Sequence, residues 1–404
     1  MSKVFQYPIL KKMKTRIYQA LTIVLLVGCS EDGPTLSESF FKIYDDSNID
    51  LSYHPIDVVE TVDGFIILSG TELTNTDFQG VQLIKVDEEG NFLVETTLDS
   101  YVAPVGNVYM LDSITYFFSM NPTTLQAVLI GVNPQLEVTL ETTIGGANYP
   151  LATSLTSSNE LLLLSYDPLN FTSEISLIGL DGSLSSSASY SIGAGSDVEE
   201  KVINHLLQVG QPLPFFCGEQ SAGNYYFNGF FNFSFSLVFT DFSANPSGVV
   251  QGQSTNAGIR AALPLSGNDF AIAGYQFDEN FQLSSSSLDP TGISSSVDLF
   301  PGDMAELKPY TPSKIISYTT GSEDYTVFAA ETKARQIVLY FYNAATGEVA
   351  GIKEIGFLNP YTFASIKATK DNTLIILGTT FAAGRFERIV LTKLSGSEIG
   401  DILK

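Results

Sequence analysis

Histidine, cysteine and tryptophan are scarce in this sequence: its 404 residues include two histidines, two cysteines and no tryptophan. The low histidine count disfavours His-rich zinc sites and most catalytic acid-base pairs, because both depend on imidazole. Basic residues are also few, with 20 Lys and Arg against 44 Asp and Glu, which gives a formal net charge of -24. A chain this acidic repels a phosphate backbone, so nucleic acid is not an expected partner. We expect no cofactor and no metal site.

The N-terminus has the pattern of a signal peptide. Four basic residues between positions 11 and 16 precede a 12-residue apolar run, Ile17 to Gly28, which is too short to span a bilayer. The run ends in Leu26-Val27-Gly28-Cys29, which resembles the lipobox of bacterial lipoproteins. The resemblance implies cleavage after residue 28 and a lipid on Cys29 that anchors the protein in the outer membrane. The alternative is a buried core segment that ends in a chance cysteine, and the start codon is either Met1 or Met13.

An acidic tether is expected at residues 29–38. Its Ser30-Glu31-Asp32-Gly33 segment resembles the surface-export signal of some Gram-negative lipoproteins, which implies a cell-surface location. The alternatives are the periplasmic face and an acidic tether without any export role. If Cys29 carries lipid, Cys217 is the one remaining thiol and no intramolecular disulfide can form.

The rest of the chain alternates short runs of β-branched and aromatic residues with Gly, Asn, Asp, Ser and Pro turns, which predicts an all-β fold. Residues Asp57 to Leu98 form one four-strand repeat. Its second strand recurs as seven segments, which start at Phe65, Ile114, Glu160, Pro214, Phe270, Thr326 and Leu374. Its third strand recurs with leucine at one position, in Leu83, Leu129, Leu177, Leu237, Leu339 and Leu391, while the fifth copy, from Phe281, is degenerate. The spacing is typical of propeller blades.

The last copy lacks a fourth strand, and Phe40 to Asp46 resembles one. We therefore predict a seven-bladed β-propeller at residues 39–404, with four-stranded antiparallel blades and an N-terminal strand that closes the last blade. The expected blades are residues 54–103, 104–149, 150–200, 201–255, 256–307, 308–360 and 361–404 plus 40–46. The Asp-Gly-aromatic-Ile-Ile-x-x-Gly-Thr pattern at residues 63–71 resembles the repeats of bacterial secreted propellers. That resemblance implies a fold and no activity.

Several catalytic sites are excluded or weakly supported. Sialidase Asp boxes and quinoprotein docking motifs end in tryptophan, so those propeller families are excluded. His54 and His205 are placed in or near first strands of non-adjacent blades, and Cys217 lies in an apolar run where a thiol acts as a small hydrophobe. Two acidic groups precede first strands, where they would face the channel: Asp197, Glu199 and Glu200, and Asp303 with Glu306. They are interpreted as a solvated rim or as the acid and base of a polysaccharide lyase or hydrolase.

The few arginines of the sequence predict a specific binding site. Arg260, Arg335, Arg385 and Arg388 all map to the loops of one propeller face, which indicates an anion site across blades five to seven. The alternative is that these arginines neutralise neighbouring carboxylates.

Aromatic residues in blade four give a second candidate contact surface. Tyr225, Tyr226 and Phe227 lie in the Gly- and Asn-containing segment Gln220 to Phe233. They form either a solvent-facing loop that stacks on sugar rings or a continuation of the flanking strands.

Taken together, these patterns predict a membrane-anchored, non-enzymatic binding module for an anionic glycan or a surface protein at the cell envelope. The alternatives are a polysaccharide lyase or glycoside hydrolase that uses channel-mouth carboxylates, and a scaffold for an outer-membrane assembly.

Overall fold

The chain divides into two compact units, Met1–Ser37 and Glu38–Lys404. The computed structural model describes residues 38–44, 52–73, 76–193, 196–210, 212–356, 358–381 and 386–404, all of them in the second unit. The predicted signal peptide and Cys29 lie outside the described residues, as does residue Arg385. No helix in the described ranges is both long enough and apolar enough to cross a membrane.

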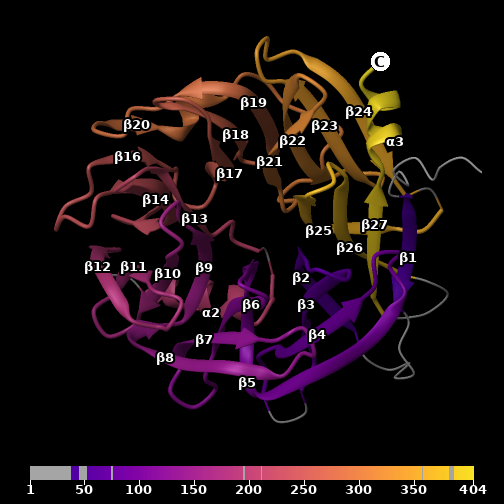
Figure 1. Cartoon of the computed structure of the whole chain (residues 1–404). Coiled ribbons are helices and arrows are strands. Elements are labelled where there is room, and N and C mark those ends of the chain that lie inside the picture. The colour runs from indigo at the N-terminus through magenta and orange to yellow at the C-terminus, as the bar shows by residue number, and fades with distance from the viewer. Residues whose placement is uncertain are drawn as a thin grey trace, which may run out of the picture. The chain divides into compact units, whose positions relative to one another are not determined.

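The second unit is all-β, as predicted, and its sheets follow one another around a ring (Figure 1). Three of the sheets have four strands each. Their strands are β9 (Pro150–Leu155), β10 (Leu161–Asp167), β11 (Thr172–Ile178) and β12 (Leu184–Ser191); β21 (Lys314–Thr320), β22 (Glu323–Glu331), β23 (Ile337–Asn343) and β24 (Val349–Ile355); and β25 (Tyr361–Ala368), β26 (Leu374–Thr380) and β27 (Arg388–Leu394) with β1 (Phe40–Tyr44).

A seven-stranded sheet follows β1 in the chain. It contains β2 (Tyr53–Glu60), β3 (Phe65–Thr71), β4 (Gly80–Val86), β5 (Phe92–Leu111), β6 (Ile114–Met120), β7 (Gln126–Val132) and β8 (Val138–Asn148). The long strand β5 pairs with β4 through its first part and with β6 through its last part. One continuous strand thus ends one four-strand group and begins the next.

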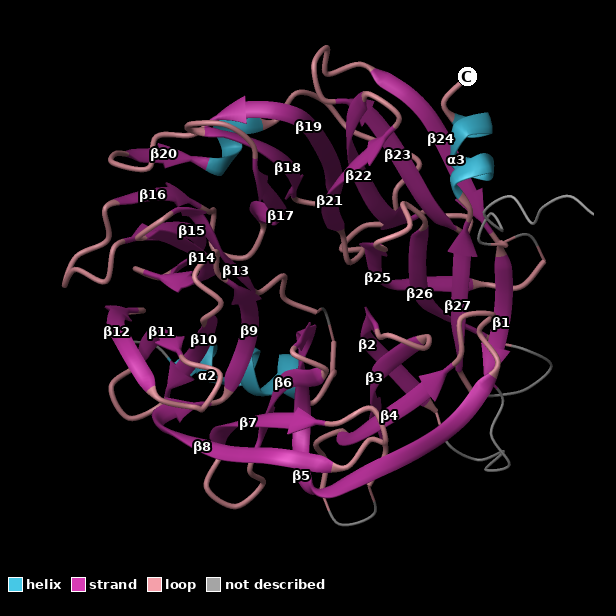
Figure 2. Cartoon of the chain, viewed as in Figure 1, coloured by secondary structure: helices cyan, strands magenta, loops and turns pink. Residues whose placement is uncertain are grey.

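The N-terminal strand joins the end of the chain. Strand β1 pairs antiparallel with β27, with Phe40 opposite Lys393 and Tyr44 opposite Ile389. This is the strand that the sequence predicted, over the residues that the structure describes, and it forms the outer edge of the β25–β27 sheet (Figure 2).

Two further sheets depart from the predicted four strands. Strands β17 (Ala257–Pro264), β18 (Asp269–Gln276) and β19 (Glu279–Ser287) form a three-stranded sheet. The neighbouring sheet has five strands: β13 (Phe216–Ser221), β14 (Asn224–Phe231), β15 (Ser234–Thr240), β16 (Gly248–Gln251) and β20 (Ile293–Ser295), the last of which pairs parallel with β16. Pro290 and Gly292 precede β20 and interrupt the chain where a fourth strand of the three-stranded sheet would begin.

In the described part of the chain, helices occupy three short segments: α2 (Ser196–Leu206), α3 (Gly396–Ile402) and the 3-10 helix η1 (Ser296–Leu299). Helix α2 corrects the prediction for the fourth repeat. Its Val202 and Leu206 pack into an apolar cluster, and the next segment, from Phe216, is the first strand β13 rather than the predicted second strand. The second strand is β14 instead. The other six predicted second strands coincide with β3, β6, β10, β18, β22 and β26.

The repeated third-strand leucines are all buried in apolar clusters between or within sheets. The turns also fit the sequence pattern. At the Asp63-Gly64 turn, Gly64 has φ +140°, and a Cβ there would lie 2.0 Å from the carbonyl oxygen of Val86. Glycine is therefore required at that turn.

Candidate functional site

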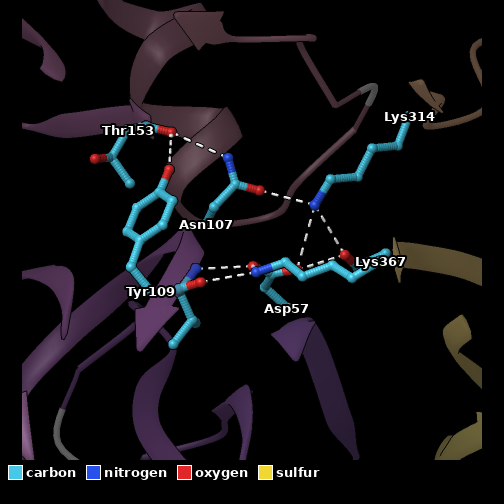
Figure 3. Close-up of polar contacts among 8 residues, drawn as sticks. Asp57, Asn107, Tyr109, Thr153, Lys314 and Lys367 are labelled. Carbon is cyan, nitrogen blue, oxygen red and sulfur yellow. Dashed lines mark hydrogen bonds and ion pairs between the residues drawn. The ribbon is translucent and has the colours of Figure 1, made fainter. Parts of the chain in front are cut away.

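A polar cluster joins three sheets through their inner strands, which are the first strands of the four-strand repeats (Figure 3). We define the inner-strand cluster as Asp57 of β2, Asn107 of β5, Lys314 of β21, and Ser365 and Lys367 of β25. The side chain of Asp57 is 1% exposed, while those of Lys314 and Lys367 are 26% and 25% exposed.

Asp57 is the centre of this cluster. Its Oδ1 accepts from Lys314 Nζ at 3.3 Å and from the hydroxyl of Ser365, and its Oδ2 accepts from Lys367 Nζ at 2.6 Å. The backbone N–H of Val108 donates to the same Oδ2 at 2.7 Å. Burial on its own would raise the pKa of Asp57, but Lys314 and Lys367 hold it well below its usual range. The carboxylate is therefore ionised at neutral pH.

The two lysines have other acceptors as well. Lys314 Nζ donates to Asn107 Oδ1 at 2.8 Å and to Ser365 Oγ at 2.9 Å, and Lys367 Nζ donates to the carbonyl oxygen of Val108 at 2.7 Å. Burial lowers the pKa of Lys367, and the attraction of Asp57 only partly offsets this shift. One carboxylate and two ammonium groups leave the cluster with one net positive charge, inside a chain whose net charge is -24.

Two cavities of similar size lie on either side of this cluster. The first, which we call the lysine cavity, has a volume of about 390 Å³ and is lined by Lys367 and by Val58, Val108 and Leu155 among others. The second, which we call the helix cavity, has a volume of about 380 Å³, and Ile56, Gly106 and Leu151 are among the residues that line it. In strand β2, Asp57 lies between Ile56, which lines the helix cavity, and Val58, which lines the lysine cavity. The same order occurs in two further inner strands, β5 (Gly106, Asn107, Val108) and β9 (Leu151, Thr153, Leu155). The polar layer thus separates the two cavities.

The helix cavity is mainly apolar and lies against the C-terminal end of α2. His205, the penultimate residue of α2, lines it and accepts from the backbone N–H of Leu213 through Nδ1 at 3.3 Å. Burial lowers the pKa of His205 to about 4, so this imidazole is neutral at physiological pH. His205 was predicted in or near a first strand, and it lies on a helix that precedes the first strand β13.

Arg260 is the predicted site residue with the most unusual surroundings. It lies on β17, at a register shift between Ile259 and Ala261, and is 4% exposed. Its guanidinium carbon is 4.5 Å from the ring centroid of Tyr275 and 5.9 Å from that of Tyr310. Within the described residues, neither Nε nor Nη2 has a hydrogen-bond partner. Burial lowers the pKa of Arg260 to about 10, so it remains charged at neutral pH.

Arg335 and Arg388 occur in a different environment from Arg260. Arg335 is exposed in the turn between β22 and β23, and Arg388 is buried at the start of β27. Burial raises the pKa of Glu331, and the positive charges of Lys308 and Arg335 oppose that shift, which places Arg335 within electrostatic reach of this buried carboxylate. Glu331 forms an ion pair with Lys308 at 2.8 Å.

Tyr225, Tyr226 and Phe227 lie in strand β14, and all three are buried. The structure therefore bears out the strand interpretation of this segment and corrects the solvent-facing one. The ring of Tyr226 packs edge-on against Phe270, with centroids 5.7 Å apart. Alternation of apolar residues through Phe231 was the signal that favoured the strand.

The remaining candidates have structural partners. Cys217 is buried, and burial raises the pKa of its thiol to about 12, as expected for a small hydrophobe. Asp303 accepts from the backbone N–H of Asn280 at 3.2 Å, and Glu306 accepts from Tyr340 at 2.8 Å. Glu199 and Glu200 lie in α2, a helix that precedes the first strand β13, and the side chain of Asp197 lies outside the described residues.

His54 of β2 is the predicted imidazole that does lie in a first strand, and its Nδ1 is 3.9 Å from Glu387 Oε2. In the ranges that the structure describes, no group of three or more His, Cys, Asp or Glu side chains is arranged to hold a metal ion.

Comparison with known proteins identifies the fold. No model of a protein family matches the sequence, and no curated protein matches it. Among solved structures, the chain is similar to a catalytically inactive variant of virginiamycin B lyase from Staphylococcus aureus, solved with quinupristin, at 12% identity and a TM-score of 0.51. This match covers 88% of the chain and 100% of the lyase. The β-propeller domain of the Trilobed protease from Pyrococcus furiosus also matches, at 8% identity and a TM-score of 0.47, over 85% of this chain and 95% of that domain. The first match, together with the sheets described above, shows that the second unit is a β-propeller.

Proposed function

We propose that this protein is a binding module of the bacterial cell envelope, built as a seven-bladed propeller at residues 39–404. Splitting the seven-stranded sheet within β5 yields two four-stranded blades, and the other five sheets supply one blade each. The seven repeats of the sequence support this count. Each blade then begins at its inner strand, which is the first strand of its repeat in the chain.

We also propose that Cys29 carries the lipid and that the protein is attached to the outer membrane, at the cell surface. The lipobox-like Leu26-Val27-Gly28-Cys29 and the basic residues before it support this assignment.

Replacing Cys29 with Ala should release the protein from membranes into the soluble fraction, because the thiol that accepts the lipid is lost. Fractionation followed by a carbonate wash measures this. Ser30→Ala is the control and should remain with the membrane. A Cys29→Ala protein that still sediments with washed membranes would contradict the anchor.

The ligand of the propeller is anionic, and the buried guanidinium of Arg260 is the observation that carries this proposal. A buried charge is costly unless an opposite charge and hydrogen bonds compensate it. Arg260 has two tyrosine rings beside it and two nitrogen atoms without acceptors in the described structure. A carboxylate or sulfate from outside the chain would supply both the charge and the acceptors, since the planar guanidinium binds these groups through paired hydrogen bonds.

Access to Arg260 depends on Tyr310. This tyrosine lies in the loop between η1 and β21, and its hydroxyl donates to Asp278 at 2.6 Å. Because Tyr310 belongs to a loop, its side chain can turn away without breaking a strand pair. The group that binds Arg260 would then be the acidic end of a glycan, such as a uronate or sulfated sugar.

Replacing Arg260 with Met should weaken binding to anionic glycans by about 1.5–3 kcal/mol per lost charge-assisted contact. The melting temperature should stay the same or rise, because an uncompensated buried charge is removed. A glycan array that includes heparin, polygalacturonate and neutral dextran, run at low ionic strength, measures the first effect. Arg335→Met is the matched control and should leave the array unchanged.

The proposal fails if wild type retains none of the anionic glycans, or if Arg260→Met lowers stability and leaves binding as it was. New reducing ends or unsaturated uronate products after incubation would instead identify an enzyme that acts on these glycans.

A further inference from the structure

The inner-strand cluster has one uncompensated positive charge beside the lysine cavity. Asp57 neutralises one of its two lysines, and the cavity itself is lined by Lys367 together with Glu60 and Lys370, which add one charge of each sign. The carboxylate of Glu60 already has a partner within the protein, since its Oε2 accepts a hydrogen bond from the backbone N–H of Lys370 at 2.9 Å. The cavity is therefore electropositive in a strongly acidic protein.

Lys367 has unused hydrogen-bonding capacity. An ammonium group has three N–H donors. Those of Lys314 meet three acceptors, on Asp57, Asn107 and Ser365. Within the described residues, Lys367 Nζ has two, Asp57 Oδ2 and the carbonyl oxygen of Val108, and the ring of Tyr109 lies 5.8 Å away. One donor of Lys367 thus remains for a group in the cavity that it lines.

The size and walls of the cavity restrict what this group can be. Its volume of about 390 Å³ is in the range of small-molecule sites, about 300–1,000 Å³. Val58, Leu155 and Ile375 supply apolar wall, while Lys367 supplies the charge. A ligand that fits both features has one negative charge and an apolar body or face.

We propose that the lysine cavity binds a small organic monocarboxylate, which accepts a hydrogen bond from the ammonium group of Lys367 and places its apolar body or face against Val58, Leu155 and Ile375. This site is distinct from Arg260, and neither site requires the other. Arg260 takes the acidic group of a glycan, whereas the lysine cavity encloses a whole small molecule.

Calorimetric titration with two carboxylates and their neutral counterparts tests this proposal: hexanoate against hexanol, and galacturonate against galactose. We expect at least one carboxylate to bind, and its neutral counterpart to bind at least ten-fold more weakly. Binding of hexanoate alone would identify an aliphatic ligand, and binding of galacturonate alone a sugar acid, so both results support the site. Absence of binding by both carboxylates, or equal binding of the neutral compounds, would overturn it.

Variants locate the site. Lys367→Met keeps the apolar stem and leaves Lys314 to pair with Asp57, and it should weaken carboxylate binding about ten-fold or more. Leu155→Trp narrows the cavity without touching the ion pairs and should abolish binding even if Lys367→Met does not fold. Lys333→Met, which removes one exposed positive charge elsewhere, is the control and should bind as wild type does. Unchanged affinity in Leu155→Trp would place the ligand outside the lysine cavity.

Discussion

Deleting residues 30–47 should lower the free energy of unfolding by about 3–5 kcal/mol, because the deletion exposes β27 as a sheet edge and removes half-buried side chains. Strand β1 pairs with β27 along its whole length of five residues. The ring of Phe40 packs edge-on against Phe65, with centroids 6.3 Å apart, and the hydroxyl of Tyr44 donates to the carbonyl oxygen of Gly90 at 2.9 Å. The deleted segment thus contacts two sheets.

Urea denaturation measures this effect through the midpoint and slope of the transition. Deleting residues 30–36 alone is the matched control, because it leaves β1 in place, and its midpoint should match that of the full protein. Equal midpoints for the two deletions would show that β1 adds nothing to closure of the propeller.

Replacing Asp57 with Asn should lower the free energy of unfolding by about 3–5 kcal/mol, because removal of one partner from a buried ion pair leaves uncompensated charge. Lys314 and Lys367 would then face each other with no carboxylate between them. Asp401→Asn is the matched control. Asp401 pairs with Lys404 at 2.6 Å, and both side chains are exposed, at 73% and 78%, so its loss should cost about 0–1 kcal/mol.

A triple variant separates charge from packing at the same site. Asp57→Leu with Lys314→Met and Lys367→Met replaces all three charges by apolar groups, and it should recover most of the stability that Asp57→Asn loses. If the triple variant is as unstable as Asp57→Asn, the cluster stabilises the propeller through its hydrogen bonds rather than through charge balance.

The Asp57 cluster also gives a pH dependence. The pKa of Asp57 is lower in the folded state than the value of about 3.9 in an unfolded chain, so the unfolded state binds the proton first as pH falls. The stabilisation is fully present above that unfolded value and is lost as pH falls toward the folded value. Wild type should therefore lose stability more steeply below about pH 4 than Asp57→Asn does, as measured by urea midpoints across this range.

The strands were predictable because their signal is local. Six of the seven predicted second strands coincide with observed strands, since a buried strand reads as a short apolar run between turn residues. The fourth repeat was misassigned because the apolar run Phe215-Phe216-Cys217 resembles the start of a second strand, although Phe216 to Ser221 is an inner strand. The spacing of Val198, Val202 and Leu206 by four residues was the available signal for α2, and it was too short to stand out in an all-β chain.

The candidate site was harder to predict because its contacts are distant in sequence. Asp57 and Lys314 are 257 positions apart, and no pattern in either strand indicates that the two pair. A carboxylate among the apolar residues Ile56, Val58 and Val59 of the first strand was the available hint. Arg260 was singled out by scarcity and was expected in a loop, but it lies in strand β17, at the register shift between Ile259 and Ala261, with its guanidinium over the ring of Tyr275.

The most direct test of anion binding by Arg260 is the arginine Nε–H NMR spectrum of the protein during titration with a sulfated or uronate-rich glycan. The chain has five arginines, and cleavage after residue 28 would leave four, so the spectrum is simple and Arg260→Lys assigns the signal by its absence. The Arg260 Nε–H signal should shift as the glycan is added, because this nitrogen has no acceptor among the residues that the structure describes, while the Arg335 signal should stay in place. A glycan that binds the protein and leaves the Arg260 signal unmoved would contradict anion binding by Arg260.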